Sequence, residues 1–396
     1  MTAGMRRWCA RPAVVMAAAA CVAAGAACWA SAPAPPALAP AAPTSAPAAP
    51  TLPHYAPVVP GLALRFPDDF GSHPNFRTEW WYVTGWLTTA SGQSLGFQIT
   101  FFRSKPAADE NNPSAFAARQ LLIAHCAISD PAHAGLWHEQ RIRRAGFGLA
   151  EAASGDTNVW IDRWALRRRA GGAGAAAGGS YLVTVDADEL ALQLSLAVTQ
   201  PPLLNGDSGF SRKGPAEASA SYYYSVPHLK VAGSVRRGGG SAEQVSGEAW
   251  LDHEWSSEYL DAEAVGWDWA GINLDDGGAL MIFRIRDARG TTRFAGGTLR
   301  DAAGRAQIFT PSDIALTPTR RWTSPRTGVV YPVAWRLRAG AREFDLEPLM
   351  DDQENDARLS AGTIYWEGAI RALESRRTVG RGYLELTGYG NRLRLQ

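Results

Sequence analysis

Two runs of alternating residues, Glu79–Leu87 and Leu95–Arg103, constrain the fold of this chain more than any other feature. Aromatic or β-branched residues alternate with small or polar ones in both runs, and Ala90, Ser91 and Gly92 separate them, so the pattern predicts a β-hairpin. Successive side chains on a strand point to opposite faces. The first run therefore presents Trp80, Tyr82, Thr84 and Trp86 on one face and Trp81, Val83, Gly85 and Leu87 on the other. A strand that is aromatic on both faces does not suit a half-solvated sheet. We expect one face to line a barrel interior and the other to contact a second domain.

A second stretch, Trp267–Arg286, repeats this design. Trp267 precedes Gly271 as Trp81 precedes Gly85, and a turn rich in Asp and Gly then leads into an apolar run that ends in arginine. The two stretches lie just under about 190 residues apart, which is close to the usual length of one domain. The spacing predicts a duplicated β architecture.

The rest of the chain contains short alternating runs and no sustained amphipathic helical periodicity. This pattern is typical of an all-β protein closed into barrels or sandwiches. Residues 31–60 are mostly Ala and Pro, which predicts an unpacked linker, and a glycine-rich loop at residues 236–241 predicts a domain boundary. We therefore expect an N-terminal domain over residues 61–238 and a C-terminal domain over residues 239–396.

Residues 1–30 have the pattern of a secretory signal peptide. Arg6, Arg7 and Arg11 precede an apolar run, residues 13–30, that is too short and too rich in alanine for a membrane span. The sequence thus predicts an exported protein, periplasmic or secreted, with no membrane span beyond the signal peptide. Lipid attachment at Cys21 or Cys28 is the alternative, although neither has Leu three residues before it.

Charge and motif spacing exclude several classes of function. The formal net charge of +1 argues against a nucleic-acid partner. The segment Gly92–Gly96 matches the hydrolase pattern G-x-S-x-G, but a strand follows where that pattern requires a helix, so Ser94 is not a good nucleophile candidate. His253-Glu254 begins like a zinc-protease motif, yet Ser257 stands where the second His is required. With no phosphate loop or dinucleotide fingerprint either, we predict no cofactor and no metal.

Two ionisable residues are candidates for acid catalysis. His253 shares a strand face with Trp255 and is a candidate proton donor if that face lines a cavity. The alternative is a His whose hydrogen bonds are satisfied by the backbone or by the Glu79 region. Asp268 shares a face with Ala270, and its pKa would rise if that face were buried. If the Trp267 face were the buried one, Asp268 would be solvated.

Several motifs together resemble the AttH-like family, a lipocalin-related family that includes the carotenoid 1,2-hydratases. They are His73-Pro74, Thr78–Tyr82 (TEWWY), Ser221–Ser225 (SYYYS), Asp252–Trp255 (DHEW), Tyr365–Gly368 (YWEG) and Gly382–Tyr389 (GYLELTGY). The resemblance runs from about Phe66 to the C-terminus and implies two lipocalin-like β-barrels in tandem. Members are often exported, and some are encoded with ABC-transporter permeases.

The resemblance also implies a site. In the hydratase branch the His and Trp of the DH-x-W element line the active site, which corresponds to His253 and Trp255 here. That branch also uses a Tyr and an Asp on the following strand region, and the apolar stretch at residues 279–285 supplies neither, so Asp268 would have to substitute. We take His253 and Asp268 as candidate catalytic residues. The candidate ligand-binding residues are Trp255, Trp81, Tyr82, Glu79, Gln98, Trp267 and Tyr223.

Two functions follow from these expectations. The first is binding of an apolar small molecule, such as an isoprenoid, polyene or acyl chain, as an accessory to an envelope ABC transporter. The second is a hydratase that protonates an alkene in a tryptophan-lined pocket before water adds. A desolvated acid that points into the cavity distinguishes them, because only the second function requires it.

Overall fold

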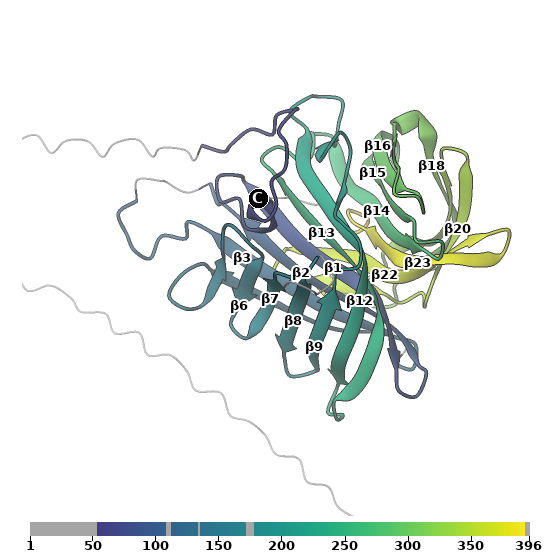
Figure 1. Cartoon of the computed structure of the whole chain (residues 1–396), viewed down its shortest axis with the longest axis horizontal. Helices are drawn as coiled ribbons and strands as arrows, with labels where there is room; N and C mark the ends of the chain where they lie inside the picture. Colours follow the sequence, from purple (N-terminus) through teal and green to yellow (C-terminus); the bar gives the residue numbers. More distant parts are fainter. Residues whose placement is uncertain (1–53, 108–111, 134, 172–177, 393–396) are drawn as a thin grey trace, which may run out of the picture. The chain divides into compact units, whose positions relative to one another are not determined.

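The structure is a computed structural model that describes residues 54–107, 112–133, 135–171 and 178–392 (Figure 1). The predicted signal peptide and most of the predicted linker lie outside these residues. The described residues belong to one compact unit. Regular structure in them is β, apart from two short 3-10 helices, η1 (Asp68–Phe70) and η2 (Pro311–Asp313). No helix in the described part of the chain is long and apolar enough to cross a membrane.

Sheet A, drawn in purple to teal in Figure 1, curls into a nearly closed barrel. Its strands follow the order β4-β3-β2-β1-β13-β12-β9-β8-β7-β6-β5, with β10 and β11 also paired to β12. Their bounds are β1 Thr78–Thr89, β2 Ser94–Ser104, β3 Leu121–Asp130, β4 Gly135–Arg144, β5 Ala150–Ala152, β6 Asn158–Ile161, β7 Trp164–Arg169, β8 Ser180–Asp186, β9 Leu190–Ala197, β10 Leu203–Leu204, β11 Phe210–Arg212, β12 Ala220–Arg237 and β13 Glu243–Ser256.

Sheet B, drawn in green to yellow, has the order β17-β16-β15-β14-β23-β22-β20-β19-β18, with β21 paired to β22. Its strands are β14 Ala264–Leu274, β15 Ala279–Asp287, β16 Thr292–Arg300, β17 Ala306–Phe309, β18 Ile314–Thr323, β19 Val330–Ala339, β20 Arg342–Pro348, β21 Glu354–Ala357, β22 Thr363–Glu374 and β23 Arg377–Leu386. In each sheet the first long strand pairs with the last one, β1 with β13 and β14 with β23. The predicted all-β class with two lipocalin-like barrels is confirmed.

The first predicted hairpin is present as β1 and β2, with Glu79 opposite Arg103. Its two faces have the expected roles. Trp81, Val83 and Leu87 belong to the interior core of sheet A. Tyr82 and Trp86 belong to a separate apolar cluster shared with sheet B, and the indole N–H of Trp86 donates a 3.1 Å hydrogen bond to the carbonyl of Gly382.

The second predicted hairpin is also present, as β14 and β15, but its alignment with the first was wrong by one residue. Trp267 and Trp269 pack into the cluster between the sheets, whereas Trp81 lies inside sheet A. Because strand side chains alternate with period two, a shift of one residue moves a side chain to the opposite face. Trp80 and Tyr82, not Trp81, are therefore the counterparts of Trp267 and Trp269.

The strands divide between the sheets later in the chain than we expected. The predicted boundary, residues 238–239, falls in the connection between β12 and β13. Strand β13 nevertheless pairs along its length with β1 and β12 of sheet A. The division between the two sheets lies between Ser256 and Ala264.

Large side chains fill the interiors of both sheets. In sheet A they include Trp81, Trp164, Trp255, Tyr181, Tyr222 and Tyr224, and in sheet B Trp335, Trp366 and Tyr331. Such interiors are packed cores, as in other small barrels.

Candidate active site

A pocket lies between sheets A and B, and its walls are aromatic and acidic. Its lining residues are Trp80, Tyr82, Thr100, Phe102, Tyr223, Asp252, Glu254, Tyr259, Trp267, Trp269, Tyr365, Glu367 and Glu385. Both sheets contribute carboxyl groups. Neither the N-terminal nor the C-terminal half of the chain could form this site alone.

Cross-strand pairing explains how these side chains gather. On sheet A, Glu254 lies opposite Trp80 of β1 on one side and Tyr223 of β12 on the other. On sheet B, Glu385 lies opposite Trp269 of β14 and Glu367 of β22. Directly opposed residues share a face of the sheet, with Cβ atoms about 4.5–5.5 Å apart. Each wall is thus a row of neighbouring side chains across three strands.

Glu367 is the most unusual of the pocket carboxyl groups. Its side chain is 2% exposed, and neither of its oxygens accepts a hydrogen bond from the described residues. Burial raises the pKa of Glu367 well above its usual value, and the nearby charge of Glu385 raises it further. Tyr82, Tyr365 and Asn355 lie nearby and oppose this rise in pKa, but burial outweighs them. The raised pKa favours the protonated form of Glu367, a proton donor that lines the pocket.

Glu385 lies beside Glu367 and is only partly buried. Its Oε2 atom accepts a 3.1 Å hydrogen bond from the indole N–H of Trp267. Restricted access to water raises the pKa of Glu385 to about 7, and the Trp267 hydrogen bond opposes this shift. The two neighbouring carboxyl groups thus differ in environment, and Glu385 is the one that ionises more easily. A pair of this kind can divide the roles of acid and base.

Asp252 forms the sheet A side of the same pocket. It accepts hydrogen bonds from the Tyr223 hydroxyl (2.7 Å), the Ser225 hydroxyl (2.6 Å) and the Trp250 indole (2.6 Å). Burial raises the pKa of Asp252 to about 7, although these three donors stabilise the charged form. Tyr223 in turn accepts from the Trp269 indole at 2.9 Å, so the network joins the two sheets.

Glu254 is paired with the buried ammonium of Lys213 at 2.8 Å. Burial raises the pKa of Glu254, and the attraction of Lys213 opposes this rise. Lys213 also lies 4.2 Å from the ring centre of Phe283 in sheet B. Glu254 lines the pocket, so the pair joins one pocket carboxyl group to a buried lysine.

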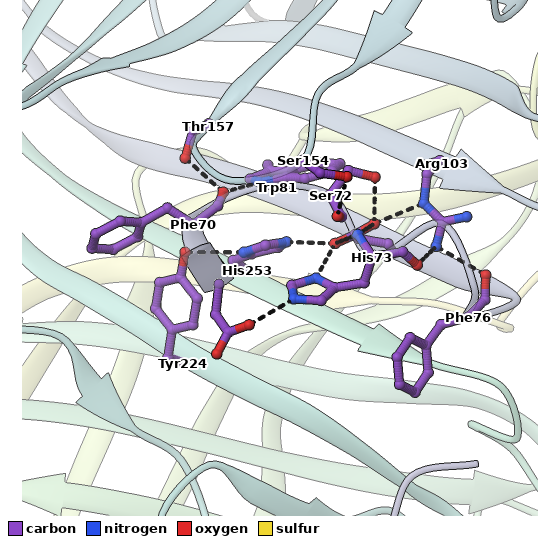
Figure 2. Close-up of polar contacts among 12 residues, drawn as sticks. Phe70, Ser72, His73, Phe76, Trp81, Arg103, Ser154, Thr157, Tyr224 and His253 are labelled. Carbon is purple, nitrogen blue, oxygen red and sulfur yellow. Dashed lines mark hydrogen bonds and ion pairs between the residues drawn. The ribbon is translucent and has the colours of Figure 1, made fainter. Parts of the chain in front are cut away.

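The candidate residues His253, Glu79, Trp81 and Trp255 form a different cluster, inside sheet A. Figure 2 shows His253 and Trp81 of this cluster, with Tyr224 and His73 beside them. His253 is fully buried. Its Nε2 atom lies 2.9 Å from Oε1 of Glu79, and its Nδ1 atom lies 2.9 Å from the Tyr224 hydroxyl. The Glu79 region thus satisfies the hydrogen bonds of His253, as one of our two alternatives expected.

Glu79 is the centre of this cluster. Arg103 donates to its Oε2 atom at 2.7 Å, and the Nδ1 atom of His73 lies 2.8 Å from Oε1. Burial alone would raise the pKa of Glu79, but Arg103 and the two imidazoles lower it well below its usual value. Glu79 is therefore a buried anion with four nitrogen partners, since the backbone N–H of His73 also donates to it.

Asp268 lies apart from both groups, on the interior side of sheet B with Ala270 and Ile272. It is fully buried, and it forms ion pairs with Arg284 at 2.5 Å and Arg286 at 3.0 Å. The Tyr389 hydroxyl also donates to it at 2.9 Å. We therefore assign Asp268 to this ion-pair cluster, because the structure brings it close to neither His253 nor the pocket.

The remaining candidates lie where the two sheets meet, with Tyr82, Gln98 and Tyr223 on sheet A and Trp267 on β14 of sheet B. Tyr82, Tyr223 and Trp267 line the pocket. Gln98 is buried on the same face as Tyr82. The Tyr82 hydroxyl and the Gln98 carbonyl oxygen have no hydrogen-bond partner among the described residues.

Our sequence reasoning did not select Glu367 or Glu385. A signal was present, since each stands two residues after a tyrosine in an apolar strand, in YWE and YLE. Period two places tyrosine and glutamate on one face. An acid that shares a strand face with an aromatic residue could have been proposed as a pocket residue.

The fold and the pocket define a class: an all-β protein with two lipocalin-like barrels and an aromatic, acid-lined pocket between them. The chain belongs to the AttH-like family, whose sequence model matches residues 57–389. The resemblance seen in the sequence is confirmed.

Solved structures agree with this assignment. A candidate AttH from Nitrosomonas europaea is 51% identical to this chain, with a TM-score of 0.77; the match covers 84% of this chain and 99% of that one. Kievitone hydratase from Nectria haematococca is 15% identical, with a TM-score of 0.62, over 86% of this chain and 98% of that one. At that identity the likeness shows the fold alone. No curated protein sequence in the comparison matches this chain.

Proposed function

We propose that this protein is an acid–base enzyme of the hydratase type, which adds water to a carbon–carbon double bond of a small apolar molecule. The observation that carries the proposal is Glu367, a buried carboxyl group that lines an aromatic pocket and accepts no hydrogen bond from the residues that the structure describes. It is the desolvated acid that distinguishes an enzyme from a binding protein. The shared fold of kievitone hydratase supports the same reaction class.

The residues of the pocket suggest a sequence of steps. Glu367 donates its proton to one alkene carbon, and a carbocation forms at the other. The faces of Trp80, Trp267 and Trp269 stabilise this cation through their π electrons. Water then attacks the cation, and Glu385 accepts the proton that the water loses. Transfer of that proton from Glu385 to its neighbour Glu367 restores the starting state, so the net reaction is alkene plus water to alcohol.

The aromatic walls also support simple binding of an apolar molecule, which is the first step of either function. Mass spectrometry of an organic extract from the purified protein would identify a bound molecule, and Trp267→Ala should lose it. Farnesol, lycopene and oleic acid would serve as probes if no molecule copurifies.

Substitution of Glu367 distinguishes a hydratase from a protein that only binds its ligand. We expect Glu367→Gln to keep the ligand and to reduce turnover by about 10²–10⁴-fold, which is the usual contribution of a general acid. Glu343→Gln, at an exposed glutamate on β20, is the matched control and should retain turnover. Incorporation of heavy oxygen from labelled water would identify the product as a hydration product. Binding with no conversion in the wild-type protein would leave a carrier as the function.

Export to the periplasm or beyond, and an accessory role beside an ABC permease, also remain proposals. Export fits the signal-like residues 1–30. Cell fractionation tests the location, and affinity purification from membranes tests the permease.

A further inference from the structure

The cluster of His73, Glu79 and His253 has the donor set of a metal centre (Figure 2). One ligand atom from each residue lies within 4.8 Å of the other two. Oε1 of Glu79 lies 2.8 Å from Nδ1 of His73 and 2.9 Å from Nε2 of His253. The acid–base pocket does not use these three residues.

We propose that His73 Nδ1, Glu79 Oε1 and His253 Nε2 bind a divalent transition-metal ion, with zinc as the best match. Two imidazoles and one carboxylate are a common zinc ligand set, with a fourth position left for water. Around a tetrahedral zinc with bonds of about 2.0–2.1 Å, ligand atoms lie about 3.3 Å apart. The distances from Oε1 of Glu79 to Nδ1 of His73 and to Nε2 of His253 would have to increase by only about half an ångström. Side-chain rotation can supply this change.

In each imidazole, the ring nitrogen that does not face Glu79 has a hydrogen-bond partner, as is usual in metal sites. Nε2 of His73 lies 3.0 Å from Oδ1 of Asp69, and Nδ1 of His253 lies 2.9 Å from the Tyr224 hydroxyl. A metal-binding histidine usually has its second nitrogen in such a hydrogen bond, which fixes the tautomer and the ring orientation. The nitrogens left free by these contacts are the two that face Glu79.

Stacking fixes the planes of the two rings. The His73 ring lies 3.7 Å from the Trp255 ring with only 7° between their planes. The His253 ring lies 4.6 Å from Trp81 at 20°. Arg103 and the Ser72 hydroxyl donate to Oε2 of Glu79, at 2.7 and 3.1 Å. The backbone N–H of His73 donates to both oxygens, at 2.9 Å to Oε2 and 3.1 Å to Oε1, so Oε1 faces the two imidazoles and this one N–H. The ligand geometry is thus organised before any metal arrives.

Without metal, protons shared between the imidazoles and Glu79 hold the cluster together. Metal binding would displace these protons, because coordination requires the free nitrogen lone pairs. Our prediction of no metal rested on linear spacing, and Glu79 and His253 are 174 residues apart in sequence. Only the pairing of β1 with β13 brings them together.

Zinc titration of untagged, full-length protein after treatment with a chelator tests the proposal. We expect the wild-type protein to bind one zinc ion at this cluster. His73→Gln should bind that ion at least 100-fold more weakly. Asp69→Asn should weaken it by about 10–100-fold, as expected for a residue that only orients a ligand. His228→Gln is the matched control. His228 also pairs with a glutamate, Glu248 at 2.6 Å, but within the described residues it belongs to no such cluster of three ligands.

Cobalt absorption gives a second readout that is independent of turnover, so the metal site and the hydratase proposal can fail separately. Tetrahedral cobalt bands should appear in the wild type and in His228→Gln and should be absent from His73→Gln. Equal zinc affinity of the wild type and His73→Gln would overturn the proposal and would point to other ligands, such as the cysteines of residues 1–30. Absence of zinc uptake by wild-type protein with a folded circular-dichroism spectrum would also overturn it.

Discussion

The chemistry of this protein rests on the different surroundings of a few carboxyl groups. Glu79 and Asp268 are buried beside arginines, whereas the buried oxygens of Glu367 accept no hydrogen bond from the described part of the chain. An ion pair favours a charged carboxylate, whereas burial alone favours a neutral acid. Carboxyl groups thus form buried ion pairs in two places and supply a candidate proton donor in a third.

The raised pKa of Glu385 predicts how stability depends on pH. The folded protein retains the Glu385 proton up to about pH 7, and the unfolded chain releases it near the ordinary value of 4.5. The folded state therefore binds more protons between these values, and the free energy of unfolding should fall as the pH rises through this window. Asp252, Glu254 and Glu367 face Glu385 and contribute to the same trend.

Urea unfolding at several pH values across this window measures the slope. Glu385→Gln should make the slope shallower, because the amide does not titrate. Glu343→Gln, which is exposed, should leave it unchanged. An identical slope in wild type and Glu385→Gln would contradict the assignment.

The sequence predicted some site residues and missed others for a physical reason. Tyr82, Tyr223 and Trp267 were identified from aromatic patterning and do line the pocket. Local patterns say which residues share a strand face, but not which faces of distant strands meet. The pairing of Glu385 with Glu367 across β23 and β22, opposite Asp252 of sheet A, therefore had to come from the structure.

At the scale of elements, the two hairpins were predictable because alternation and turn residues are local signals. The alignment of one hairpin with the other was harder to predict. Trp267 matches Trp81 in its spacing to a glycine, but Trp81 lies inside sheet A, whereas Trp267 lies between the sheets. The sequence also could not predict that β13 belongs to sheet A. That assignment depends on pairing with β1, which is distant in the sequence.

The turn of the first hairpin gives a prediction about backbone conformation. Gly92 has a φ of +86°, and an added Cβ atom would meet nothing within 4 Å. Gly92→Ala should therefore lower the free energy of unfolding by about 1–2 kcal/mol through backbone strain alone. Gly239 also has open space but no positive φ, so Gly239→Ala is the matched control. Chemical denaturation of both variants measures the difference, and equal stability of the two would disprove the explanation.

At the scale of the whole molecule, the two sheets depend on each other through a shared apolar cluster. Trp86 of β1 is 4% exposed, donates to Gly382 of β23, and lies under the guanidinium groups of Arg371 and Arg381. Its loss removes contacts that belong to neither barrel core.

We expect Trp86→Ala to lower the free energy of unfolding by about 3–5 kcal/mol, as for other large buried side chains. Trp160 lies on β6 of sheet A and is partly exposed, so Trp160→Ala should lower the free energy of unfolding by less. Scanning calorimetry should show one transition in the wild type and a separation of the two sheets in Trp86→Ala. A Trp86→Ala variant as stable as Trp160→Ala would mean that the sheets are energetically independent.

The pairing of β1 with β13 also sets the order of events as the chain is made. Thr78 on β1 bonds to Ser256 on β13, 178 residues later, and Glu79 has no His253 beside it until that strand has been synthesised. The edge of β1 that pairs with β13 therefore has no partner strand until β13 is synthesised, when most of sheet A is already present. Contacts so distant in sequence form slowly, and an open strand edge invites association with other chains. We expect this protein to fold late in its synthesis and to aggregate when it is truncated before β13.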